Sequence, residues 1–346
     1  MTRTFDPDAA SAPGSGIYGL PHTPEEARVV VVPVPFAATT SYGGGAEEGP
    51  SAVLRASRQV DRYDRETGRP YESGIAMAPE SDRVRRCDRE ARALAEQVIA
   101  VGGDVSGSPA LAAALAQVNL LCGEVNDLVY REVSGWLDRG KLVALVGGDH
   151  AVPFGCIQAH AERHPGMGVL HLDAHADLRT AYEGFTWSHA SIMANVLDHV
   201  PGVAKLVQVG VRDLSNEEAA RIDGARGVVA TFFDADLAAQ RFDGEPWSKV
   251  VASIVAELPA EVYLSFDIDG LDPTLCPHTG TPVPGGLSFA EATALVAAVA
   301  RSGRRIVGMD LVEVVPGPDG DEWDGNVAAR LLYKMIGHAL RTSRRA

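Results

Sequence analysis

Three short motifs rich in aspartate and histidine are the parts of this chain most suited to chemistry. They are residues 147–150 (GGDH), 173–177 (DAHAD) and 267–272 (DIDGLD). Carboxylate oxygens mixed with imidazole nitrogens, without cysteine, suit Mn²⁺ and related first-row divalent ions. Because so many carboxylates would repel one another without cations, the motifs favour two metal ions that share carboxylate ligands.

The spacing within two motifs allows their side chains to converge. In an extended chain, alternate residues point to the same side. Asp173, His175 and Asp177 can therefore face one site, as can Asp267 and Asp269. The sequence thus predicts one compact cluster of ligands rather than acids scattered over loops.

The elements that must position these motifs are short apolar runs. Such runs lie at residues 29–34, 142–146, 168–172, 205–211, 262–266 and 305–315. Helical segments, including 109–137 and 326–340, separate or follow them. This alternation predicts an α/β fold with a parallel sheet covered on both faces. Since open α/β sheets bind ligands at the carboxyl ends of their strands, we expect the three motifs to meet there.

Composition excludes several classes of partner. The 346 residues include 31 Lys+Arg and 46 Asp+Glu, a net charge of −15, which disfavours binding to nucleic acid or anionic lipid. No apolar run approaches the roughly 20 residues of a membrane-spanning helix. The four cysteines are scattered without a CxxC pair, which indicates free thiols. We therefore expect a cytoplasmic protein with no nucleic-acid or membrane partner.

The chain is expected to form one domain after a terminal arm. Residues 1–24 are rich in Pro, Gly, Ser and Thr and are predicted to be a flexible arm. Residues 25–346 contain no internal repeat and no linker-like segment after residue 30, which favours a single catalytic domain.

The motifs resemble the signatures of a known family. In this order, GGDH, DAHAD and SFDIDGLDP are similar to those of the ureohydrolase (arginase/agmatinase) family of binuclear manganese enzymes. The similarity extends from Val29 to Leu340 and includes residues 280–286 and 310–313. It implies a three-layer α/β/α fold around an eight-stranded parallel sheet. It also implies hydrolysis of a guanidino group to urea and an amine, and a homotrimer or homohexamer.

The resemblance also implies a set of metal ligands. By position these are His150, Asp173, His175, Asp177, Asp267 and Asp269. Asp173 and Asp267 would bridge two divalent ions, with Mn²⁺ expected and Ni²⁺ as the alternative. His150 and Asp177 would complete one site, and His175 and Asp269 the other.

Two further residues match catalytic and substrate-binding positions of the family. His189 matches a histidine that shuttles protons near the leaving amine, a task that suits imidazole. Glu313 matches a glutamate that holds the guanidinium, which a carboxylate can accept in bidentate form. We assign both to catalysis and substrate binding, and count Asp177 with them as catalytic. The alternatives are a structural histidine and a solvated glutamate, whereas His171 is expected to be hydrogen-bonded in the core.

The sequence indicates the family more specifically than it indicates the substrate. Arginases of this family carry an asparagine where this chain has Arg179, and a guanidinium there disfavours the α-ammonium of arginine. Arg179 would instead bind a substrate carboxylate or be neutralised by Glu183. An agmatinase-like activity is therefore expected. The alternatives are hydrolysis of free guanidine, of guanidinobutyrate or guanidinopropionate, or of arginine.

Two other classes of protein share this fold. One is the deacetylase branch, which uses a single zinc; the extra ligands His175 and Asp269 argue against it. The other is a non-catalytic assembly subunit, which is expected to have lost metal ligands. Here all six family positions carry the expected residue.

Overall fold

A single parallel sheet forms the centre of the molecule, as expected. The computed structural model describes residues 5–225 and 227–343, and within them the strand order is β2-β1-β3-β8-β7-β4-β5-β6. The strands are β1 (Val29–Val34), β2 (Ile75–Met77), β3 (Leu142–Gly147), β4 (Met167–Leu172), β5 (Val203–Val211), β6 (Val229–Phe233), β7 (Glu261–Asp267) and β8 (Arg305–Val312). All neighbouring strands pair in parallel.

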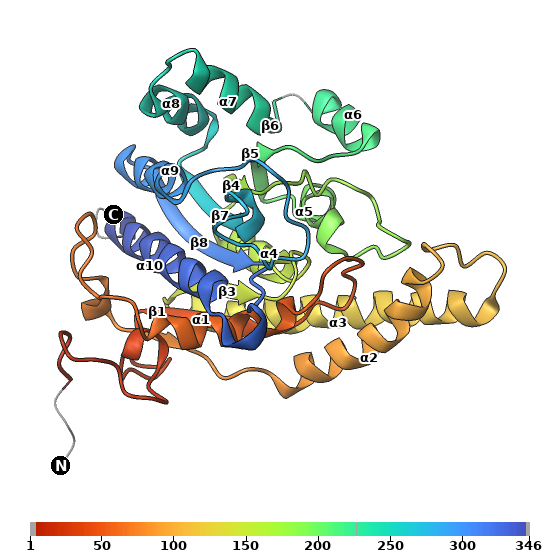
Figure 1. Cartoon of the computed structure of the whole chain (residues 1–346), viewed down its shortest axis with the longest axis horizontal. Helices are drawn as coiled ribbons and strands as arrows, with labels where there is room; N and C mark the ends of the chain where they lie inside the picture. The colour runs from red at the N-terminus through yellow and green to blue at the C-terminus, as the bar shows by residue number, and fades with distance from the viewer. Residues whose placement is uncertain (1–4, 226, 344–346) are drawn as a thin grey trace.

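Helices cover both faces of this sheet (Figure 1). They are α1 (Gly49–Ser57), α2 (Asp82–Ile99), α3 (Pro109–Asp138), α4 (Phe154–Arg163), α5 (Ile192–His199), α6 (Asn216–Gly224), α7 (Asp234–Phe242), α8 (Trp247–Glu257), α9 (Phe289–Arg301) and α10 (Trp323–Ser343). Val29 and Val31 of β1 pack in one apolar cluster, with α1, α8, α9 and α10. Val30 and Val32 pack in the other, with α2, α3, α4 and α5. This alternation confirms the three-layer α/β/α fold.

The predicted strands are present, and the differences lie at the sheet edges and at one strand end. β2 and β6, which the apolar runs did not indicate, are the two edge strands. β2 is only three residues long, too short for a periodic signal. The run predicted over 305–315 ends as a strand at Val312, because Glu313 adopts a left-handed backbone with φ 60°.

The sheet order explains how distant motifs meet. β3, β8, β7 and β4 are consecutive central neighbours. The three motifs follow β3, β4 and β7, and Glu313 follows β8. Four segments far apart in the sequence therefore bring their polar residues to one edge of the sheet, where parallel strands end together.

The described part of the N-terminal segment is attached to the body of the protein. Tyr18 is fully buried. Its hydroxyl donates to the carbonyl of Ala329 in α10 at 3.0 Å, and its backbone N–H donates to Ser57 of α1 at 2.9 Å. Arg62 donates to the Tyr18 carbonyl at 2.9 Å. The packing differs from the loose arm that composition predicted, because a buried aromatic residue anchors a mainly polar stretch; residues 1–4 lie outside the described part.

Two observations bear on the environment of the protein. In the part of the chain that the structure describes, no helix is both long and apolar enough to cross a membrane. The four cysteines, Cys87, Cys122, Cys156 and Cys276, are free and buried.

The anchoring of Tyr18 makes a testable prediction. Tyr18→Phe removes a buried hydrogen bond to a carbonyl of α10, so the free energy of unfolding should fall by about 0.5–1.5 kcal/mol. Urea denaturation followed by circular dichroism measures this. Tyr63→Phe is the matched control because Tyr63 is 67% exposed. Equal stabilities of the two variants would contradict the anchoring role.

Candidate metal centre

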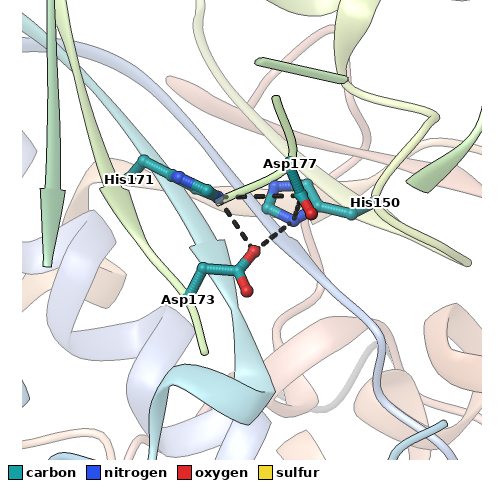
Figure 2. A group of neighbouring side chains, drawn as sticks. All are labelled: His150, His171, Asp173 and Asp177. Atoms are coloured by element: carbon teal, nitrogen blue, oxygen red, sulfur yellow. Dashed lines mark hydrogen bonds and ion pairs between the residues drawn. The ribbon is translucent and has the colours of Figure 1, made fainter. Parts of the chain in front are cut away.

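The predicted ligands converge at the carboxyl edge of the central strands. Potential ligand atoms of His150, His171, Asp173 and Asp177 lie within 4.8 Å of one another. A second group with the same spacing contains Asp173, His175 and Asp269. Figure 2 shows the first group, with the imidazoles of His150 and His171 turned towards the Asp173 carboxylate. Two adjoining groups that share one aspartate are suited to a pair of ions.

Asp173 lies between the two groups. Its Oδ2 is 2.9 Å from Nδ1 of His150, and its Oδ1 is 3.4 Å from Nδ1 of His175. Each oxygen therefore faces a different histidine. This is the arrangement that a carboxylate bridging two ions requires.

The third motif completes the cluster. Oδ2 of Asp267 is 3.2 Å from Nδ1 of His150, and its Oδ1 accepts the backbone N–H of Asp269 at 2.9 Å. Oδ2 of Asp269 lies 3.1 Å from Nδ1 of His175. Oδ2 of Asp177 lies 3.2 Å from Nδ1 of His150. All six residues expected as ligands thus lie in one cluster.

Hydrogen bonding leaves Nδ1 of His150 available as a ligand atom. Nε2 of His150 is 3.0 Å from Oγ of Ser265, and that hydroxyl donates to Oδ1 of Asp310 at 3.0 Å. Because Ser265 uses its proton on Asp310, His150 must donate through Nε2–H. The lone pair of Nδ1 then points at the carboxylates, as metal binding requires.

His171 has the opposite hydrogen-bond pattern. The amide of Gln208 donates to Nδ1 of His171 at 3.0 Å and to the carbonyl of Ala176 at 2.7 Å. The oxygen of the same amide accepts from Thr231 at 3.0 Å, which fixes its orientation. His171 therefore carries its proton on Nε2 and donates to Asp173 at 2.8 Å. It orients a carboxylate and offers no lone pair to a metal, in keeping with the core role expected for it.

Burial of so many acids demands positive charge. The side chains of Asp173, Asp177, Asp267 and Asp269 are at most 5% exposed. Burial, together with the charges of Asp269 and Asp173, raises the pKa of Asp267 well above its usual value. Burial and the charge of Asp173 raise the pKa of Asp177 to about 6. Oxygen and imidazole donors with this excess of negative charge fit divalent cations.

Two site residues adopt a strained backbone. Asp177 has φ 54° and Glu313 has φ 60°, in the left-handed region that side chains disfavour. Such conformations persist where neighbouring contacts hold them, and they occur preferentially at functional sites. In both cases the strain turns the chain sharply at the end of the segment that follows a central strand.

A cavity of about 180 Å³ opens beside the second group, at His175. Its wall includes His175, Asp177, Arg179 and His189. Tyr42 also borders it, at the start of the glycine run 43–45, where all three glycines have positive φ. The cavity therefore gives a small molecule access to one side of the candidate metal centre.

His189 lies at this cavity with one free ring nitrogen. It begins the short helix η4 (His189–Ser191), which Ser188 caps. Its Nδ1 has no hydrogen-bond partner among the described residues, and its ring lies edge-on to Tyr182 at 5.9 Å. Burial, followed by the charges of His175 and His150, lowers its pKa. A neutral imidazole with an unused nitrogen is suited to accept or relay a proton.

Glu313 lies on the inner side of the cluster rather than on the cavity wall. It is 5% exposed, and its Oε1 accepts the backbone N–H of His150 at 2.9 Å. Its own N–H donates to the Gly148 carbonyl at 2.8 Å. Burial, followed by the charge of Asp149, raises its pKa well above the usual value. One carboxylate oxygen thus stays available for a cationic group, and the burial of Glu313 is at odds with the alternative of a solvated glutamate.

Arg179 is neutralised, but by a residue that the sequence did not indicate. Its Nε lies 3.6 Å from Oε2 of Glu218 in α6, and its guanidinium stacks over the ring of Tyr182 at 5.2 Å. Glu183, the partner considered from sequence, forms no ion pair with Arg179 among the described residues. Glu218 belongs to a distant helix, so only the packing of α6 reveals the contact.

Comparisons with known proteins agree on one family. A family model described as "Arginase family" matches residues 27–337. The N(1)-aminopropylagmatine ureohydrolase of Thermus thermophilus is 36% identical over 93% of this chain and 94% of its own. The agmatinase of Bacillus anthracis is 30% identical over 90% and 92%. The crystal structure of agmatine ureohydrolase of Thermoplasma volcanium matches with a TM-score of 0.71 and 25% identity, covering 96% of each chain.

The convergence of ligands can be tested by metal analysis. His150→Ala and Asp269→Asn should each bind roughly one ion fewer per chain, because each residue would complete a different site. Plasma mass spectrometry after loading with Mn²⁺ measures the content. Asp272→Asn is the control, since among the described residues the side chain of Asp272 hydrogen-bonds to Thr274 and not to the cluster. Full metal content in both ligand variants would refute the assignment.

Proposed function

The chain belongs to the arginase family, and from this premise we propose that it hydrolyses the guanidino group of an agmatine-like substrate to urea and an amine. One observation carries the proposal. The six histidine and aspartate side chains expected as ligands, from three separate segments, lie in one buried cluster beside a cavity. A subunit without catalysis would have no use for so costly a concentration of buried charge.

The proposed cofactor is a pair of divalent ions, Mn²⁺ for preference and Ni²⁺ as the alternative. His150 and Asp177 would hold one ion, and His175 and Asp269 the other. Asp173 and Asp267 would be shared between them. Two such ions, when bound, lower the pKa of water and so supply hydroxide at neutral pH.

The remaining steps fall to side chains around the cluster. We assign the guanidinium to Glu313, whose buried carboxylate keeps one oxygen uncommitted and can bind N–H groups strongly. His189, which borders the cavity, would transfer a proton to the departing amine. Burial of Glu313 also excludes water from the group that holds the planar guanidinium.

The surroundings of Arg179 support an amine-tailed substrate. Arg179 borders the cavity, but its charge is balanced by Glu218. Asp213 also borders the cavity and is exposed, with no ion pair among the described residues. A cationic tail would therefore meet a net negative wall, whereas a carboxylate tail would compete with Glu218 for Arg179. We propose Arg179 and His189 as substrate-binding residues because both line the cavity.

The proposal extends to the assembly and the location of the protein. We propose a homotrimer or homohexamer, as the family resemblance implies, built from a single catalytic domain over residues 25–346. Four free, buried cysteines support a reducing compartment and hence the cytoplasm. Sedimentation velocity on the full chain tests the assembly.

A urea-release assay tests the proposed activity. Metal-loaded protein should release urea from agmatine, and Glu313→Gln should keep its metal while KM rises roughly ten- to a hundredfold, because a charge-assisted contact to the guanidinium is lost. The panel should also contain guanidinobutyrate, guanidinopropionate, guanidine and arginine. No urea from any of these with two ions bound would refute the enzyme.

Arg179→Ala tests what the cavity mouth recognises. The change leaves Glu218 unpaired, so cationic substrates should gain in kcat/KM relative to carboxylate-tailed ones, by several-fold. The same panel, measured on the parent and the variant, gives the ranking. An unchanged ranking would mean that Arg179 does not read the substrate.

A further inference from the structure

The turn that carries Asp177 is tied to helix α6 by one side chain, Glu218. We propose that Glu218 is a positioning residue of the metal centre: it holds Asp177 in its ligand orientation and links that ligand to Arg179 at the cavity mouth. This inference rests on the proposed function, in which Asp177 binds a metal ion. Among the described residues, the Glu218 side chain contacts Leu178, Arg179 and Ser215 and none of the six expected ligand side chains.

The turn needs outside support because its backbone is strained. Asp177 has φ 54°, and residues with a Cβ persist in this region only when their surroundings hold them there. Three contacts hold residues 177–179. The Asp177 carbonyl accepts from the N–H of Ala194 at 3.1 Å, and the Arg179 N–H donates to the carbonyl of Ala190 at 3.1 Å. The central contact is the Leu178 N–H, which donates to Oε1 of Glu218 at 3.0 Å.

In these three hydrogen bonds, Glu218 is the only acceptor that belongs to a side chain. Leu178 is 2% exposed and Glu218 is 3% exposed, so solvent has little access to replace this acceptor. Loss of the carboxylate would leave a buried N–H without a partner, next to a backbone that already sits in a disfavoured region. Relaxation of the turn would then move the Asp177 carboxylate away from Nδ1 of His150, now 3.2 Å away.

The carboxylate is itself firmly placed. Its Oε2 accepts from both the N–H and the hydroxyl of Ser215 at 2.8 Å, and Ser215 in turn caps α6. The same oxygen lies 3.6 Å from Nε of Arg179. One buried group therefore connects the start of α6, the turn of a metal ligand and a residue at the cavity mouth. A change in Arg179 can reach the metal centre through Glu218.

Metal titration of the full chain tests the proposal. In Glu218→Ala, one Mn²⁺ site should weaken roughly 10–100-fold, as loss of a partner behind a ligand typically does, while the other keeps its affinity. Calorimetric titration of the metal-free protein gives both affinities. Electron paramagnetic resonance at two equivalents of Mn²⁺ should show isolated ions in place of a coupled pair.

Two variants separate positioning from the stability of α6. Glu217→Ala removes the neighbouring acid from the first turn of α6; Glu217 is exposed and forms no ion pair among the described residues, so both affinities should stay at the parent values. Ser215→Ala removes the helix cap but keeps the acceptor for Leu178. It should lower the melting temperature and change metal affinity much less than Glu218→Ala does.

The proposal is overturned if Glu218→Ala and Glu217→Ala bind metal with the same affinity as each other at each of the two sites. A loss in Ser215→Ala as large as in Glu218→Ala would also overturn it, because helix stability would then explain the effect. If Glu218→Ala does not fold, Glu218→Gln replaces it. Its single amide oxygen cannot accept from both Leu178 and Ser215, so the metal affinity of the same site should fall. These readouts need no substrate, so failure of the parent to release urea would refute only the proposed function.

Discussion

The constraint on which the site depends is a concentration of buried negative charge at one edge of the sheet. Four aspartates, almost fully buried, lie around two histidines. Such a cluster is tolerable only where protons or cations compensate it, and divalent ions supply this positive charge while binding the lone pairs of carboxylate and imidazole. Neighbouring hydrogen bonds are arranged accordingly. Ser265 leaves Nδ1 of His150 available, whereas Gln208 and Asp173 engage the two ring nitrogens of His171.

The fold meets this constraint through strand order. A parallel sheet ends its strands at one edge, and β3, β8, β7 and β4 are central neighbours there. Both faces of these strands pack against helices, so the backbone that carries the ligands is rigid. The chain leaves the site through strained residues, Asp177 and Glu313, each held by hydrogen bonds to a neighbouring segment. Strained turns and packed strands together place the ligands.

The charge of Arg179 at the cavity is balanced by contacts within the cavity wall. Arg179 alone would repel a cationic substrate, but Glu218 balances its charge and Tyr182 stacks on it. Glu218 also accepts the backbone N–H beside Asp177. The cavity mouth and the turn that carries Asp177 are thus connected through one buried carboxylate.

Local patterns in the sequence were sufficient for the class of fold and for the chemistry. Apolar runs marked six strands, and the residue types of three motifs indicated a two-metal cluster, because periodicity and ligand chemistry are properties of short segments. The short edge strands β2 and β6, the stop at Glu313 and the anchoring of Tyr18 were not apparent, since packing against distant segments decides them. The same holds for Arg179, whose partner is Glu218 rather than the nearby Glu183. The residue type determines the chemistry of a side chain, but the tertiary structure determines its partner. Only the tertiary structure brings α6 to the turn after β4.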